Sequence, residues 1–378
     1  MYFSRSINRE VKEIYWHNFL ASFASALVFI FEPIYLYTLS SSLIYVLWFY
    51  VQIYVWYAVF ISFGAKFASK FGYKHSILLS NIFYVIYWVT LYFIKAESAL
   101  FYIAPMFFAL QKSFFWPAFD ADMSLNDQKR QRGREVGVLF STQELAFIIG
   151  PLLGGFLLSA FGFLPLFVLA GVLTFVSVIP LFQSRDIFDR HEFRVKNLWQ
   201  VIKTHKRNFF AYWGYAEDLM SQSLWPVYIF LFVPAFSGVG AVNAVAMLIA
   251  TVVMLYIGKR SDLGNKQHLI EISSIAYGVS WMLRFLARMV PAILVFDALS
   301  KTLKAMVTVP VIALSYENAG SKGPDHAIAY SVFYEFSLAV GKVFTALAAI
   351  YILSATNNIY LVFGFAGILT MFYGLLRK

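Results

Sequence analysis

The stretch Trp225-Pro226-Val227-Tyr228-Ile229-Phe230 repeats an earlier one, Glu32-Pro33-Ile34-Tyr35-Leu36-Tyr37, at an offset of 193 residues. In both stretches a proline in second position is followed by apolar and aromatic residues. Matches that keep their order and nearly keep their offset predict that one half of the chain is a duplicate of the other. Further pairs in this series are Gly72 and Gly264, Pro117 and Pro310, Glu144 and Glu335, and Gly150 and Gly341.

The composition around these repeats is that of a membrane protein. The chain of 378 residues is 60% hydrophobic and 13% charged, and its mean hydropathy is +0.69. These values are too apolar for a soluble globule of this size. The stretches 145–184, 219–258 and 343–376 hold no charge at all. Because one helix crosses the bilayer with about 20 residues, each stretch predicts a helical hairpin.

Counting spans in this way predicts an all-α membrane protein with twelve transmembrane helices. We expect two pseudo-symmetric six-helix bundles, at 1–183 and 208–378. The charged segment 184–207 between them reads as a cytoplasmic linker with a short amphipathic helix around 198–202. The expected spans are 16–38, 43–65, 76–94, 98–118, 137–160, 164–183, 208–233, 238–257, 267–288, 290–313, 326–348 and 356–376.

The basic residues set the expected orientation. Most of the 30 lysines and arginines fall in the N-terminal tail, in alternate connections, in the linker and at the C-terminus. The positive-inside rule therefore predicts two cytoplasmic termini, and the expected location is the plasma membrane. The same rule and anionic lipid explain the net charge of +10, so we expect a lipid bilayer as partner and no nucleic acid. The chain has no cysteine and its six histidines are scattered, so no metal or cofactor is expected.

Two connections resemble a known loop signature. The segment 65–74 is similar to the pattern Gly-x-x-x-Asp-Arg-x-Gly-Arg-Lys of the major facilitator superfamily, with Ser69 in place of the aspartate and Gly72 kept. The segment 258–266 keeps Gly258, Asp262 and Gly264 but is one residue shorter. A tight turn needs glycine, and an acid there can hold helix ends together. The resemblance implies a gating role for these loops, with the gate weakened where Ser69 replaces the acid.

A second motif strengthens the resemblance to that superfamily over essentially the whole chain. Gly150-Pro151-Leu152-Leu153-Gly154-Gly155 is similar to the antiporter signature Gly-Pro-x-x-Gly-Gly of the family. Small residues let helices approach closely and proline permits a bend, so this helix could rock. Plain small-residue packing explains the same pattern. The repeat at Gly341 lacks the proline.

Charges inside the expected spans are the candidates for function. Each costs a few kcal/mol in hydrocarbon and therefore usually faces a cavity or a partner. The resemblance implies that seven of them lie on cavity-lining helices, with Glu144 and Glu335 on flanking helices. The seven are Glu32, Lys112, Glu217, Asp218, Asp297, Lys301 and Lys304.

The glutamates are the expected sites of proton coupling. Glu144 and Glu335 hold equivalent places in the repeat, with Lys112 and Lys342 as expected counter-charges. A buried carboxylate of this kind can load and release a proton, and a static ion pair that locks two helices is the competing interpretation. Glu32, directly before Pro33, is a comparable candidate.

The lysines suggest an alternative. Lys301 and Lys304 are near one another on one expected helix and Lys112 lies on the related helix of the other half, so they could attract an anionic substrate group. Against this, Asp297 is one turn from Lys301 and can neutralise it. Arg284 on the preceding expected helix is expected to pair with Asp297 or to meet the outer interface.

Together these patterns predict a secondary active transporter and not an enzyme. We expect alternating access, with a small, amphipathic organic substrate exported in antiport with protons by a monomeric protein. An organic-anion carrier that uses the lysines is the alternative within transport. A non-transporting membrane sensor or a lipid scramblase on the same fold is the alternative outside it. No nucleophile–base pair, metal cluster or phosphate loop is present in the sequence to suggest catalysis.

Overall fold

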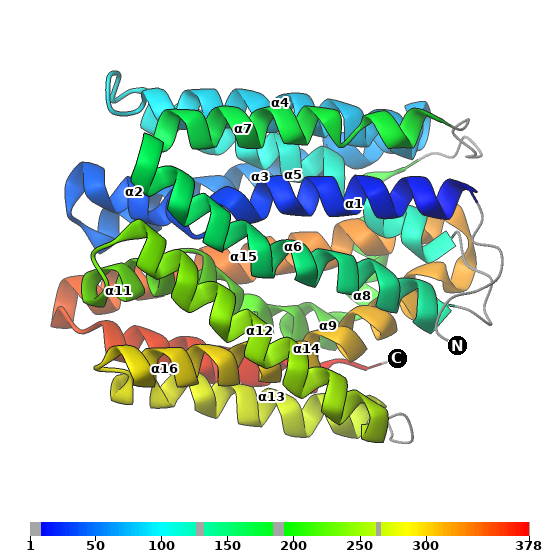
Figure 1. The fold of residues 1–378 in the computed structure, drawn as a ribbon. Coiled ribbons are helices and arrows are strands. Elements are labelled where there is room, and N and C mark those ends of the chain that lie inside the picture. Colours follow the sequence, from blue (N-terminus) through cyan, green and yellow to red (C-terminus); the bar gives the residue numbers. More distant parts are fainter. Residues whose placement is uncertain (1–8, 126–131, 184–192, 262–265, 378) are drawn as a thin grey trace.

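The structure is a computed structural model that describes residues 9–125, 132–183, 193–261 and 266–377. Within these ranges the regular structure is helical, and the helices run side by side along one direction (Figure 1). The first half of the chain contributes α1 (Arg9–Val28), α2 (Phe31–Ser40), α3 (Leu43–Phe71), α4 (Tyr73–Phe93), α5 (Leu100–Leu125), α6 (Arg132–Phe161), α7 (Phe163–Val176) and the 3-10 helix η1 (Ile179–Gln183).

The remainder of the chain starts with the linker helix. Its elements are α8 (Val195–Thr204), α9 (Lys206–Ala211), η2 (Tyr212–Tyr215), α10 (Ala216–Gln222), α11 (Leu224–Phe232), α12 (Phe236–Ser261), α13 (Lys266–Met282), η3 (Leu283–Leu286), α14 (Val290–Ala319), η4 (Gly320–Lys322), α15 (Pro324–Thr356), α16 (Ile359–Thr370) and η5 (Met371–Leu375). Helix α8 is the amphipathic helix expected around 198–202. It packs against α15 and buries Leu198 and Val201.

Eight helices in the described residues are long and apolar enough to cross a membrane, and a shorter apolar helix covers 359–375. Three expected spans, at 98–118, 208–233 and 290–313, are helical but do not meet that criterion. All three contain candidate charges, which are Lys112 in α5, Glu217 and Asp218 in α10, and Asp297, Lys301 and Lys304 in α14. The span expected at 208–233 is also divided into short helices. The spans that look least like membrane helices are therefore spans that hold candidate charges.

The exterior of the molecule is apolar and its interior carries charges. Phe63 and Val295 are more than 60% exposed, at 62% and 63%, whereas Glu217 and Arg284 are 0% and 1% exposed. This inverts the usual arrangement of a soluble protein, because hydrocarbon and not water faces the outer side chains. The protein is thus an integral, multi-pass membrane protein.

The repeated prolines mark breaks at equivalent places. Helix α1 gives way to α2 two residues before Pro33, and α10 gives way to α11 two residues before Pro226. Proline has no N–H, so it cannot donate to the carbonyl four residues earlier, which belongs to Phe29 or Gln222. Each half therefore has a helix break at the repeated proline, where the carbonyl four residues earlier lacks its usual helical donor.

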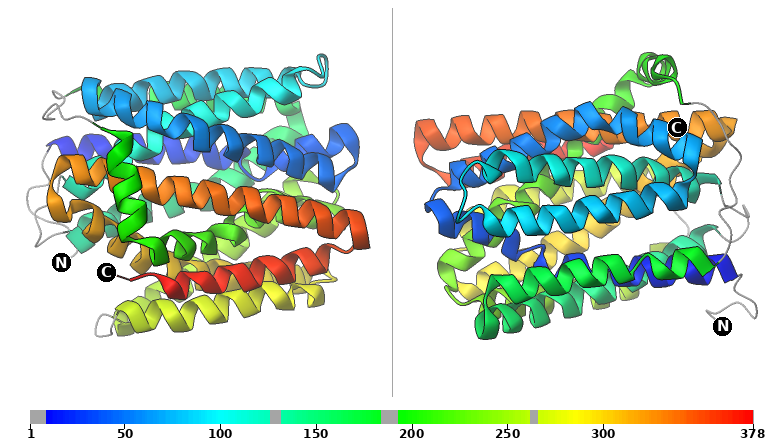
Figure 2. Two further views of the ribbon diagram at one scale, coloured as in Figure 1. Left: turned by 180° about the vertical axis from the view of Figure 1, so that it is seen from behind. Right: turned by 90° about the horizontal axis from the view of Figure 1, so that it is seen from above.

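Two helix pairs form the most extensive contacts between the halves, and α5 with α15, α2 with α11 and α5 with α14 add smaller ones. Helix α6 packs against α12, and α3 packs against α15. Helices α6 and α12 lie side by side at the front of Figure 1, and α3 (blue) lies beside α15 (orange) in the left view of Figure 2. The beginning of α1 and the end of η5 lie at the same end of the molecule (Figures 1 and 2).

Candidate functional site

The adjacent acids Glu217 and Asp218 on the short helix α10 form the centre of a polar network. The carboxylate of Asp218 accepts hydrogen bonds from Lys304 of α14 at 2.7 Å and from Lys342 of α15 at 2.5 Å. The side-chain amide of Gln222, one turn further along α10, also donates to Asp218, at 2.7 Å. One aspartate therefore holds two lysines from two other helices.

Glu217 points to a different set of partners. Its carboxylate accepts hydrogen bonds from the hydroxyls of Tyr277 at 2.9 Å and Tyr373 at 3.0 Å. Its Oε2 lies 3.5 Å from Nζ of Lys304, which therefore lies between the two acids of α10. The side chain of Glu217 is fully buried.

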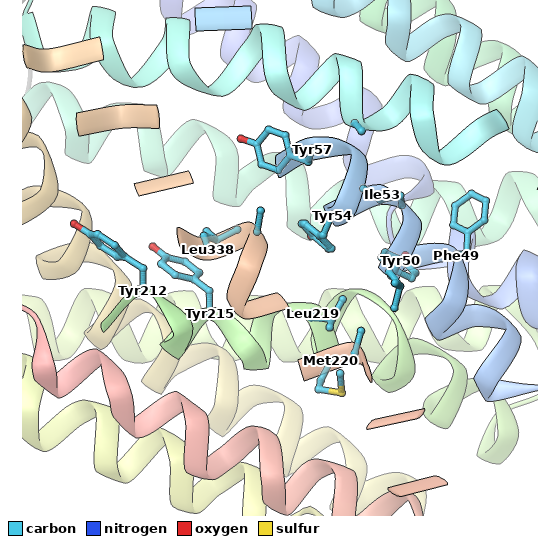
Figure 3. Packing of buried hydrophobic residues seen from close by; sticks show 14 of the residues in the cluster. Phe49, Tyr50, Ile53, Tyr54, Tyr57, Tyr212, Tyr215, Leu219, Met220 and Leu338 are labelled. Atoms are coloured by element: carbon cyan, nitrogen blue, oxygen red, sulfur yellow. The ribbon is translucent and has the colours of Figure 1, made fainter. Parts of the chain in front are cut away.

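Three tyrosines of α3 extend this hydrogen-bond network into the first half of the chain. Tyr50, Tyr54 and Tyr57 are spaced four and three residues apart, so they share one face of the helix. Figure 3 shows them beside Leu219 of α10 and Leu338 of α15. The three tyrosines face the other half because α3 packs against α15.

Each tyrosine hydroxyl binds a different polar group. Tyr54 accepts from Lys342 at 3.1 Å and donates to the side-chain oxygen of Gln222 at 3.1 Å. Tyr57 donates to Glu335 at 2.8 Å. Tyr50 lies 3.0 Å from a carboxylate oxygen of Glu32. These tyrosines are not among the residues predicted from the sequence, where their spacing of four and three residues on an apolar helix is the one sign of a shared face.

Lys112 differs from the other lysines of the network. Its ammonium lies over the rings of Phe108 and Tyr54, at 5.0 Å and 5.8 Å from their centroids. Within the part of the chain that the structure describes, it forms no ion pair. Its charge is within electrostatic range of Glu32, Glu335 and Asp218. Lys112 is thus a cation held by ring faces and by acids at longer range.

Neither Glu335 nor Glu144 makes a direct ion pair with Lys112 or Lys342 among the described residues, although both lysines are within electrostatic range of Glu335. Lys342 binds Asp218 and not Glu335, because seven residues separate it from Glu335 along α15 and place it two turns away. Glu144 accepts from Thr251 of α12 at 2.8 Å and not from Lys112, because α6 packs against α1 and α12.

Asp297 and Lys301 belong to a separate cluster. Asp297 accepts from Lys301 and, at 2.9 Å, from the indole of Trp225. The expected pairing of Arg284 with Asp297 is not found among the described residues. The guanidinium of Arg284 instead lies between two indole rings, 3.8 Å from the centroid of Trp225 and 3.3 Å from that of Trp281. Asp297 is within electrostatic range of this guanidinium but does not contact it directly, and the two indole faces hold the cation instead.

The glycines of the motif at 150–155 serve close helix contacts. A methyl group at Gly150 would lie 2.5 Å from Cβ of Ala26, and one at Gly154 would lie 2.1 Å from the carbonyl oxygen of Leu27. Both contacts are with α1. Gly155 approaches the start of α12, where the carbonyl oxygen of Phe236 would lie 2.6 Å from an added methyl group.

Pro151 completes the contact between α6 and α12. Its carbonyl oxygen would lie 2.2 Å from a methyl group at Gly240. The motif therefore lets α6 touch its own half and the other half within one turn.

The loop signature is described only in part. Gly72 ends α3 with φ of 102°, a conformation that favours glycine. Ser69 is buried, and its hydroxyl accepts at 3.4 Å from the main-chain N–H of Phe193 in the linker. Gly258 lies in α12, whereas Asp262 and Gly264 lie outside the described residues.

One further contact between the halves had not been expected. Asp120 of α5 is buried and accepts from the hydroxyl of Tyr316 of α14 at 3.0 Å. Asp120 lies beyond the expected end of its span, because α5 continues to Leu125.

Comparison with known proteins agrees with this architecture. The family model described as Major Facilitator Superfamily matches residues 15–243. The solved structure "In meso crystal structure of the POT family transporter PepTSo" superimposes with a TM-score of 0.74 at 13% identity, over 98% of this chain and 97% of that one. At this identity the likeness shows the fold alone. The search of curated proteins found no match. The family match spans more than half of the sequence, and the chain therefore belongs to the major facilitator superfamily, which makes it a transporter and not an enzyme.

Proposed function

We propose that the protein is a proton-coupled secondary transporter that moves a small organic solute by alternating access. Twelve membrane-crossing helices form two bundles, at 1–183 and 208–378, joined by the linker 184–207. The internal repeat and the equivalent breaks before Pro33 and Pro226 support this division. Related halves packed around a central site are a common plan for carriers.

Both termini of the protein face the cytoplasm, and the membrane is the plasma membrane. The clustering of basic residues supports this orientation. The position of the beginning of α1 and the end of η5 at one end of the molecule is consistent with it. The carrier works as a monomer.

The observation that carries the proposal is the ionic network around Asp218. Its acids and lysines lie on α10, α14 and α15 of one half, and Tyr54 of the other half contacts Lys342 and Gln222. Movement of one half against the other breaks these tyrosine contacts. Exposed alternately to each side, the network offers solute and protons a polar site within hydrocarbon.

Glu335 and Glu32 are the proposed proton carriers. Each is buried, and each is bound by a tyrosine hydroxyl with no direct ion pair among the described residues. Asp218, in contrast, is held by two ammonium groups and serves as a fixed counter-ion. Glu144 lies at the contact between α6 and α12, and we assign it to that contact.

The direction of transport is export in exchange for protons. The motif at 150–155 supports this choice, since it resembles the antiporter signature and lies where α6 meets both α1 and α12. Aromatic side chains around the network, among them Tyr54 and Phe108, suit an amphipathic solute.

A second candidate, transport of an organic anion, rests on Lys112 alone. Lys304 and Lys301, which the sequence grouped with it, are neutralised by Asp218 and Asp297. Lys112 makes no such pair in the described part of the chain, so it can take a carboxylate or phosphate group of a solute.

Flux in proteoliposomes tests the proposal. A thermal-shift screen of purified protein against metabolites and drugs first selects solutes that bind the folded form. Each hit is added to proteoliposomes that enclose a pH-sensitive dye, with empty liposomes as control. We expect solute-dependent proton movement. Binding without flux would identify a sensor, and lipid exchange without solute flux would identify a scramblase.

A further inference from the structure

The hydroxyl of Tyr50 has two acceptors but only one proton. It lies 3.0 Å from Oε1 of Glu32 and 3.0 Å from the main-chain oxygen of Gln222. A phenol donates one hydrogen bond and can accept others. At any moment it therefore makes a full hydrogen bond to only one of these two oxygens.

The carbonyl of Gln222 is available because of the bend in its helix. Pro226 follows four residues later and has no N–H to donate to it. Tyr50 comes from α3 of the first half, so its bond to Gln222 joins the two halves. Tyr54, one turn along α3, binds the side chain of the same glutamine.

We propose that Tyr50 transmits the protonation state of Glu32 to the contact between the halves. A protonated Glu32 donates its own proton to the Tyr50 oxygen, and Tyr50 then donates to the carbonyl of Gln222. An ionised Glu32 instead accepts the tyrosine proton, and the carbonyl of Gln222 loses its donor. No proton leaves the tyrosine in either state. The inference deepens the proposed function and rests on its proton coupling.

The surroundings of Glu32 single out Tyr50 for this role. Helix α4 presents Tyr84 and Tyr87 to Glu32, and α5 presents Lys112. Helix α7, which contacts α2 through Phe163 and Phe167, carries no charged residue, and α11 carries no carboxylate or ammonium group. Its Tyr228 hydroxyl is bound to Ala287 and Tyr360. Of the groups that face Glu32, Tyr50 is the one whose side chain also hydrogen-bonds the second half within the described residues.

The test measures how pH changes the separation of the halves. Because the chain has no cysteine, Ser98→Cys and Thr356→Cys give a clean pair of spin-label sites. Both positions are exposed, in the turn after α4 and at the end of α15. Label distances are recorded for protein in liposomes, in acidic and in mildly alkaline buffer.

Four variants are compared on this labelled background. We expect the distance distribution of the parent to shift with pH. The distribution of Glu32→Gln should stay at the one that the parent shows in acidic buffer, because the amide N–H of the new glutamine donates to Tyr50. Tyr50→Phe loses the shift. Pro226→Ala loses it too, because the new N–H can bind the carbonyl of Gln222. Tyr45→Phe, an α3 tyrosine that stacks on Phe101 away from the network, keeps it.

The outcomes separate this inference from the proposed function. A full shift in Tyr50→Phe overturns the inference and leaves proton coupling intact. No shift in the parent overturns both. If Tyr50→Phe does not yield monodisperse protein, Pro226→Ala decides, since it leaves Tyr50 in place, and a retained shift there overturns the inference.

Discussion

Two charged clusters lie in the second half, and they differ in which helices complete them. Around Asp218, the acids and lysines of α10, α14 and α15 are completed by Tyr54 from the first half. Around Asp297, the hydrogen-bonding partners in the described residues, Lys301 and Trp225, both belong to the second half. The movement of one half against the other that we propose would therefore disturb the first cluster and leave the second unchanged. Burial of charge alone does not identify a working site.

The largest effect is expected from Asp218→Asn, which breaks the first cluster. It leaves two lysines without their carboxylate, and removal of one partner of a buried ion pair costs about 3–5 kcal/mol. We expect a large fall in melting temperature and no transport. Active, stable Asp218→Asn protein would show that the cluster is not central.

Arg284→Met tests the cluster around Asp297, because Arg284 lies against Trp225, which hydrogen-bonds Asp297. Loss of the cation between two indoles lowers the free energy of unfolding by about 2 kcal/mol. Transport per folded molecule stays at the parent level, because no residue of the first half takes part. A normal melting temperature with lost flux would place this cluster in the moving site.

Glu335→Gln separates coupling from stability within the first cluster. The amide oxygen still accepts from Tyr57, so the free energy of unfolding changes by less than about 1 kcal/mol. We expect solute exchange to persist while flux no longer follows the pH gradient. Counterflow measures solute exchange, and flux driven by a pH gradient measures coupling, both on one preparation. A gradient response equal to that of the parent would exclude Glu335 as the proton carrier.

The smallest effect on stability is expected from Lys112→Met, because this lysine has no ion pair to lose in the described residues. Binding of an anionic solute should weaken about 10-fold or more, as expected for loss of one charged hydrogen bond. Lys301→Met is the matched control, since Asp297 already occupies that lysine. Equal loss in both variants would contradict an anion contact at Lys112.

Much of the fold could be predicted from the sequence. Apolar runs locate the helices, because a bilayer requires each crossing segment to satisfy its own main-chain hydrogen bonds. The offset of 193 residues predicts two equivalent prolines, and the structure has a helix break before each.

The partners of the charges could not be predicted in the same way. Glu335 and Lys342 lie near one another in sequence but meet Tyr57 and Asp218, on other helices. Which faces meet depends on how each helix is rotated about its axis, and an almost uniformly apolar helix gives little sign of its rotation. The tyrosines of α3 were missed for the same reason.

The matched bends before Pro33 and Pro226 have a consequence for how the carrier responds to acidity. The internal repeat gives each half the same bend, and at each bend the carbonyl four residues before the proline lacks its usual helical donor. The residue before the proline differs: Glu32 can gain or lose a proton, whereas Trp225 in the equivalent position cannot. Under the proposed proton coupling, this one difference between the repeated segments makes the first bend sensitive to acidity and leaves the second indifferent to it.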